Sequence, residues 1–195
     1  MPDLLAAGYP VRCMARDPGK LSDRPWSGDI EIAAADALEG TTVRRAMESV
    51  HVAYCLIHSL GTGASFEQRD RDAAAIFANA AMSAGVTRIV YLCGVVSADG
   101  SGLSPHQRSR AEVGDILVGS GVPVAALQAA VIIGSGSASF EMLRYLTERL
   151  PVRVTPKWVE TRIQPIVVHD VLRYLVGCAA LPPGVSRRFD IGGDV

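Results

Sequence analysis

The chain has 195 residues, of which 49% are hydrophobic and 20% are charged, and its formal net charge at pH 7 is −1. This composition supports a sizeable core and argues against disorder, and the balanced charge indicates neither a nucleic-acid nor an anionic-membrane partner. No apolar run reaches the roughly 18–20 residues that span a bilayer, and we expect no signal peptide before the first predicted strand.

The first predicted elements lie in the opening stretch MPDLLAAGYPVRCMARDP. The segment DLLAAG is typical of the last turns of a helix, with Gly8 in the position that ends it. The run at 11–15 (VRCMA) then predicts a buried strand. A helix that leads into a buried strand is normally the second half of a strand–helix–strand unit, so the question is where the first strand lies.

Further apolar runs predict strands along the rest of the chain, at 30–34, 52–57, 88–93, 123–133, 163–168 and 188–191. Most are continuous rather than alternating, as expected when helices cover both faces of a parallel sheet. Amphipathic or apolar stretches between them predict helices over 65–85, 104–121, 139–151 and 169–183. This alternation predicts an α/β fold with a doubly wound parallel sheet, forming a single domain over 1–195.

The four cysteines lie inside apolar segments rather than in a metal or redox motif. Cys13, Cys55 and Cys93 fall in strand-like runs and Cys178 in a helix-like one, and none has CxxC spacing. We therefore expect buried free thiols, no metal ligands and a reducing, cytoplasmic location.

Candidate site residues follow the predicted strands, because ligands of doubly wound sheets bind beyond the carboxyl ends of the strands. Arg16 follows the strand at 11–15, where an arginine binds the 2′-phosphate of NADP, or it is a solvated turn residue. Asp36, followed by Ala37, accepts a hydrogen bond from an adenine amino group or belongs to a turn. His58, at the end of the strand at 52–57 and followed by Ser59 and Leu60, points into a cleft or has a structural role.

A glycine- and serine-rich segment, GSGSASF, follows the fifth predicted strand. It places backbone amides and a helix start near a phosphate or sugar, or it is a tight strand-to-helix turn with a serine as N-cap.

Several segments in order resemble the NmrA-like, atypical short-chain dehydrogenase/reductase group. They are VRCMARDPGKL, ADALEG, YCLIHSLG, AGVTRIVYLCGVVS, GVPVAALQAAVIIGSGSASFEMLRYL and IQPIVVHDVLRYL. The resemblance covers nearly the whole chain. It implies a Rossmann fold, a bound NAD(H) or NADP(H), and usually a small C-terminal part that shapes a substrate pocket.

Members of this group begin with a strand and a glycine-rich turn of the type VTGATGYIG, which this sequence lacks. The resemblance implies that roughly 15–20 residues of a βαβ unit are absent, that Met1 is a late start, and that the chain is also truncated at its C-terminal end. In the order 3-2-1-4-5-6 the absent strand is central, so the strands at 11–15 and 52–57 lose their ladder partner. The resemblance therefore implies dinucleotide binding for the group, and poor or no cofactor binding as the expectation for a chain without the glycine turn.

The catalytic position departs from the Tyr-x-x-x-Lys pattern of short-chain dehydrogenases. His106 and Arg110 stand at that spacing, and Cys93 or Gly94 replaces the usual catalytic serine. His106 is a substitute acid/base or a surface residue near the pocket, with His58 as the second candidate. Arg110 is able to bind a ribose or phosphate but not to relay a proton.

We therefore predict an NAD(P)-binding protein, an oxidoreductase or sugar-nucleotide epimerase relative, with NADP as cofactor and NAD as the alternative. The competing hypotheses are a non-catalytic NmrA-like NADP-sensing regulator and an inactive fragment. The substrate is a small molecule that the sequence does not name, and we expect a homo-oligomer because strand edges are open. The predicted cofactor-binding residues are Arg16, Asp36, Ala37, His58, Ser59, Leu60, Cys93, Gly94, Arg110, Ala130 and Val131.

Overall fold

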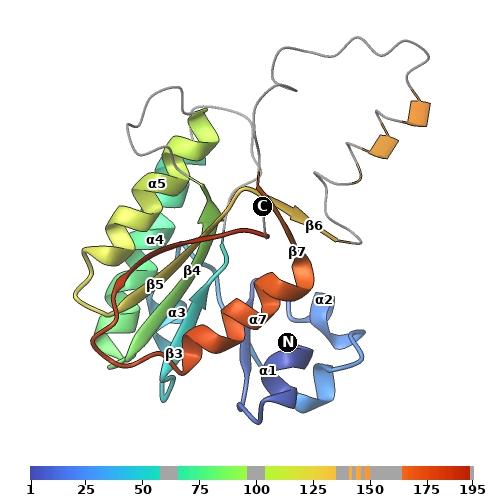
Figure 1. Cartoon of the computed structure of the whole chain (residues 1–195). Coiled ribbons are helices and arrows are strands. Elements are labelled where there is room, and N and C mark those ends of the chain that lie inside the picture. The colour runs from blue at the N-terminus through green and yellow to red at the C-terminus, as the bar shows by residue number, and fades with distance from the viewer. Residues whose placement is uncertain are drawn as a thin grey trace.

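The computed structural model describes residues 1–57, 66–95, 104–134 and 164–193, with the isolated residues 141, 144, 145, 148 and 149. Helices and strands alternate along the chain (Figure 1). The strands are β1 (Arg12–Ala15), β2 (Glu31–Ala34), β3 (Val52–Cys55), β4 (Arg88–Gly94), β5 (Val124–Ala129), β6 (Val131–Ile133), β7 (Pro165–Val167) and β8 (Arg187–Ile191). The helices are α1 (Pro2–Ala6), α2 (Gly19–Ser22), α3 (Gly40–Ala46), α4 (Phe66–Ser83), α5 (Pro105–Val118) and α7 (Val168–Ala179), with a 3₁₀ turn at Ser27–Asp29.

All strand pairs in the described residues are parallel. The largest sheet has the order β3-β4-β5-β8, and two further sheets pair β1 with β2 and β6 with β7. Parallel pairing requires crossover connections, and α4 and α5 supply those from β3 to β4 and from β4 to β5. The predicted α/β fold with parallel strands is confirmed.

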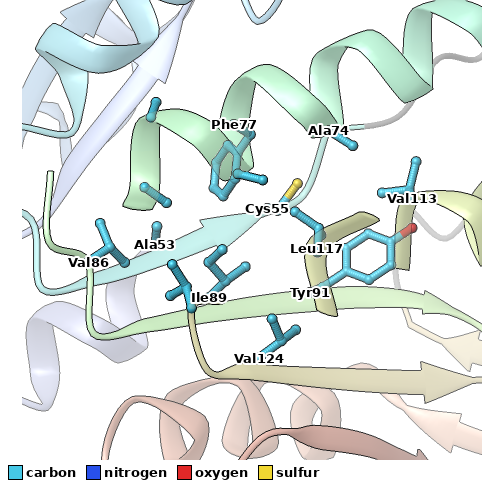
Figure 2. Packing of buried hydrophobic residues seen from close by; sticks show 14 of the residues in the cluster. Ala53, Cys55, Ala74, Phe77, Val86, Ile89, Tyr91, Val113, Leu117 and Val124 are labelled. Atoms are coloured by element: carbon cyan, nitrogen blue, oxygen red, sulfur yellow. The ribbon is translucent and has the colours of Figure 1, made fainter. Parts of the chain in front are cut away.

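Helices cover both faces of the four-stranded sheet. Successive residues of a strand point to opposite faces, so one strand contributes to a hydrophobic cluster on each face. On one face Ile89 of β4 packs with Phe77 of α4 and Leu117 of α5 (Figure 2). On the other face Val90 of β4 packs in a second cluster with Val171 of α7. Burial on both faces explains why β4 and β5 read as continuous apolar runs.

A buried arginine ties the amino end of β4 to the loop between α7 and β8. Arg88 is only 3% exposed. Its guanidinium donates hydrogen bonds to the carbonyl oxygens of Val185 (2.7 Å), Leu181 (3.2 Å) and Pro182 (2.6 Å). These three carbonyl acceptors offset part of the cost of burying the cation, because a buried polar group is costly unless it is hydrogen-bonded.

The helix boundaries agree with the cap signals in the sequence. Ser104 and Gln107 form a capping box at the start of α5, and Pro105 is its first residue. Gly85, after α4, has φ +71° and Gly121, after α5, has φ +82°, a backbone conformation that favours glycine.

The structure corrects two predicted elements and contains a helix that the sequence pattern does not predict. The run at 123–133 is two strands that separate at Ala130, because β5 pairs with β4 and β8 whereas β6 pairs with β7. β3 ends at Cys55, so the strand does not extend to residue 57. Helix α3 is absent from the prediction, since only Val43 of its residues is buried.

β1 and β3 share no ladder partner in the part of the chain that the structure describes. β1 pairs only with β2. β3 is the edge strand of the four-stranded sheet and pairs only with β4. Met14 of β1 nevertheless packs against the cluster that contains Ala53 of β3. The sulfur of Cys13 lies 3.5 Å from that of Met1, beside α1, which packs against α7. Helices therefore connect the two sheets where no strand does.

Candidate functional site

A cavity of about 600 Å³ lies at the carboxyl ends of β1 and β2, beside the end of β3 and the first turns of α4. It brings together three of the predicted cofactor residues, Arg16, Asp36 and Ala37. The full lining is Met14, Ala15, Arg16, Ala35, Asp36, Ala37, Leu38, Ile57, Arg69, Asp70 and Ala73. The cavity therefore has apolar walls and four charged side chains.

Both carboxylates of the cavity accept hydrogen bonds from the protein. Oδ1 of Asp36 accepts the backbone N–H of Leu38 at 2.9 Å, an Asx turn that sets the loop after β2. Oδ2 of Asp70 accepts a hydrogen bond of 3.0 Å from the hydroxyl of Ser109. Ser109 is 1% exposed on α5, so this bond connects two helices within the interior.

Unlike the carboxylates, the two arginines of the cavity are not paired with any described residue. Arg16 and Arg69 are exposed, and neither forms a hydrogen bond or ion pair with a described residue. Sequence reasoning did not single out Arg69 or Asp70. The available signal was spacing, because Arg69 stands four residues before Ala73, which the helical pattern already places on the inward face.

A second group of predicted residues lies where β4 meets α5, outside the lining of the cavity. The phenol of Tyr91 donates a hydrogen bond of 3.1 Å to the carbonyl oxygen of Arg110. Burial raises the pKa of the Cys93 thiol to about 11, although the guanidiniums of Arg188 and Arg110 act in the opposite direction. Cys93 is therefore a neutral thiol near pH 7, and Gly94 is the last residue of β4.

His106 lies in the first turn of α5 and is exposed. Its ring stacks on Phe66, the first residue of α4, with centroids 4.5 Å apart and an interplanar angle of 27°. No described residue forms a hydrogen bond with the imidazole. Arg110 follows one turn along the same helix and is half-buried, so the pair has the predicted spacing.

The remaining predicted residues divide into two groups. His58, Ser59 and Leu60 lie outside the described residues, as does 135–140 of the GSGSASF segment. Ala130 is exposed at the point where β5 ends, and Val131 pairs with Pro165; neither lines the cavity. The structure thus brings together Arg16, Asp36 and Ala37, but not the whole predicted set.

Neither a metal-binding cluster nor a membrane-spanning helix occurs among the described residues. They contain no group of three or more histidine, cysteine or acidic side chains placed to hold a metal ion. None of their helices combines the length and the apolar character needed to cross a membrane.

Comparison with known proteins gives one family match and many similar folds. Residues 1–136 match the family described as NAD(P)H-binding. MoeE5 in complex with UDP-glucose and NAD has a TM-score of 0.76 and 20% identity, over 98% of this chain and 70% of that one. WbmG of Bordetella bronchiseptica, in complex with NAD, has a TM-score of 0.76 and 13% identity, over 98% and 67%.

DesIV, a dTDP-glucose 4,6-dehydratase from Streptomyces venezuelae with NAD and TYD bound, has a TM-score of 0.74 and 15% identity, over 100% of this chain and 71% of that one. At such identities the likeness concerns the fold. No curated protein matches the sequence.

Proposed function

The chain belongs to the NAD(P)H-binding family, and on that premise we propose that it is an oxidoreductase or sugar-nucleotide epimerase relative that prefers NADP(H). The observation that carries the proposal is the cavity at the ends of β1 and β2, where Arg16, Asp36 and Ala37 converge. Ligands of doubly wound sheets bind at this edge.

The lining of the cavity fits the adenosine half of a dinucleotide. Ala37, Ile57 and Ala73 provide apolar walls for a base. Asp36 uses Oδ1 for the Leu38 amide, and we assign its Oδ2 to an adenine amino group. The guanidinium of Arg16 follows β1, where it would bind a 2′-phosphate through charge-assisted hydrogen bonds.

Acid/base chemistry would come from the first turn of α5. When bound, the cofactor supplies a hydride acceptor or donor. His106 is the proposed proton carrier, because it stands at the tyrosine position of the Tyr-x-x-x-Lys spacing, and His58 is the second candidate. Arg110 would hold a ribose or phosphate group and does not relay a proton.

One observation favours a second candidate function, a non-catalytic NADP-sensing regulator. The imidazole of His106 is exposed, and no described residue orients it by a hydrogen bond. A general base is normally oriented by a third group.

We propose a cytoplasmic location for either function, in keeping with four free cysteines.

Calorimetric titration of the chain with NADP⁺ and NAD⁺ tests the cofactor assignment. A charge-assisted contact of about 1.5–3 kcal/mol predicts roughly ten- to a hundredfold tighter binding of NADP⁺. Arg16→Ala should abolish this preference, whereas Arg24→Ala, an exposed arginine outside the cavity, should leave it unchanged. Equal affinities of the wild-type chain for the two cofactors would refute the preference, and no binding would favour the inactive-fragment hypothesis.

A turnover assay separates the enzyme from the regulator. UDP-glucose, which MoeE5 binds, is the first substrate to test. NADP⁺ reduction followed by absorbance detects an oxidoreductase, whereas an epimerase, which regenerates its cofactor in each cycle, is detected by the sugar nucleotide that it forms. His106→Ala should lower turnover by roughly 10²–10⁴ and leave cofactor affinity nearly intact. Arg110→Ala should weaken cofactor binding first. His51→Ala, at the opposite edge of the sheet, is the matched control.

A further inference from the structure

We propose that Arg69 of α4 is a second phosphate ligand of the cavity, acting with Arg16 on a phosphate group of the bound nucleotide. The inference rests on the proposed nucleotide-binding function and adds a residue to it. Arg16 follows β1 and Arg69 lies in the first turn of α4, so separate elements bring two guanidiniums to one cavity of about 600 Å³.

The hydrogen bonds within the cavity distinguish its cations from its anions. The carboxylates of Asp36 and Asp70 accept hydrogen bonds from a Leu38 amide and a Ser109 hydroxyl. Neither Arg16 nor Arg69 donates to any described residue. The donors left for a ligand are therefore guanidinium groups, which match the oxygens of a phosphate.

A neighbouring arginine of the same helix, Arg71, does have partners, so the lack of a partner at Arg69 is not shared by every arginine of α4. Arg71 donates to Glu112 at 2.6 Å and to Gln68 at 3.2 Å. Arg71 does not line the cavity, whereas Arg69 does. Two arginines on one helix thus differ in both orientation and pairing, and Arg71 is a matched control.

A nucleotide would use both kinds of surface in the cavity. Its base fits the apolar walls formed by Ala37, Ile57 and Ala73. Its phosphate would then bind the guanidiniums of Arg16 and Arg69, with Arg69 binding the 2′-phosphate or the 5′-phosphate. Both sources share the chemistry of an adenosine phosphate monoester, and the experiment distinguishes them.

The test is calorimetric titration of the whole chain with 2′-AMP, 5′-AMP and adenosine. Arg69→Ala should weaken binding of at least one phosphorylated nucleoside by about tenfold or more and leave adenosine unchanged. Arg69→Lys, which keeps the charge but not the fork of donors, should restore part of that loss. Arg71→Ala should change none of the three affinities, since its exposed ion pair contributes little to stability.

Three outcomes would overturn the inference. If wild type binds 2′-AMP or 5′-AMP and Arg69→Ala binds both equally well, the role of Arg69 is wrong and the cofactor proposal stands. If Arg69→Ala weakens adenosine as much as the phosphorylated ligands, its effect is structural. If wild type binds neither phosphorylated nucleoside, this inference and the proposed function fail together. Equal melting temperatures of wild type and variants establish that affinity, not folding, has changed.

Discussion

Removal of the Ser109 hydroxyl should destabilise the contact between α4 and α5. Ser109 is 1% exposed, and its hydroxyl lies 3.0 Å from Oδ2 of Asp70. A hydrogen bond to a charged group contributes about 1.5–3 kcal/mol. Alanine returns about 0.5 kcal/mol through its higher helix propensity, and the half-buried carboxylate regains some water. We expect Ser109→Ala to lower the free energy of unfolding by roughly 1–2 kcal/mol.

Urea denaturation followed by circular dichroism measures this change. A double-mutant cycle with Asp70→Ala, which removes the acceptor, isolates the pair, and the two losses should be less than additive. Asp72→Ala is the control, because Asp72 pairs with Gln68 at 2.8 Å on the exposed face of the same helix, and its loss should stay within about 0.5 kcal/mol. A loss below about 0.5 kcal/mol for Ser109→Ala, with additive effects in the cycle, would refute the reasoning.

Three further predictions concern thiols, a buried arginine and strand edges. Burial raises the pKa of Cys55 from 9.0 to about 12 and of Cys93 from 9.0 to about 11. Stability is therefore fully present below pH 9 and should fall by roughly 1 kcal/mol per thiol by pH 10; equal urea midpoints at pH 8 and pH 10 would contradict this. Arg88→Met leaves three carbonyl oxygens without their donor and should cost roughly 3–5 kcal/mol, at about 1–2 kcal/mol for each unsatisfied carbonyl; a loss below about 1 kcal/mol would show that water replaces the guanidinium. The unpaired edges of β1 and β3 should pair with other copies of the chain, so light scattering should show association that rises with concentration, whereas a monomer at all concentrations would count against open edges.

The sequence predicts those parts of the fold and site that depend on local pattern. Arg16 and Asp36 were found because each follows an apolar run, and in a parallel sheet the carboxyl ends of strands meet at one edge. The bend at Ala130 was missed because the apolar run continues through it. An uninterrupted apolar run does not show that the strands on its two sides pair with different partners.

Side-chain pairing is the part that the sequence does not show. Arg69 and Arg71 are both arginines in a charged stretch of one helix, and sequence alone does not distinguish a cavity residue from a solvated one. The distinction depends on Glu112 of α5, which takes up Arg71. α3 was missed for a related reason, since its two threonines and single buried valine give a weak helical pattern.

The gap between β1 and β3 means that the walls of the cavity belong to two ladders without a common strand. Arg16 and Asp36 belong to the β1–β2 side. On the other side, Ile57 follows β3 and Arg69 lies in α4. A nucleotide that touches both sides would act as a cross-link between them. Its binding would then couple the folding of the two sides. At a ligand concentration of one hundred times Kd, binding would add about 2.7 kcal/mol to the free energy of unfolding. Amide exchange in β1 and β3 would slow together as ligand is added, so that the ligand determines whether the two ladders unfold separately or as one unit.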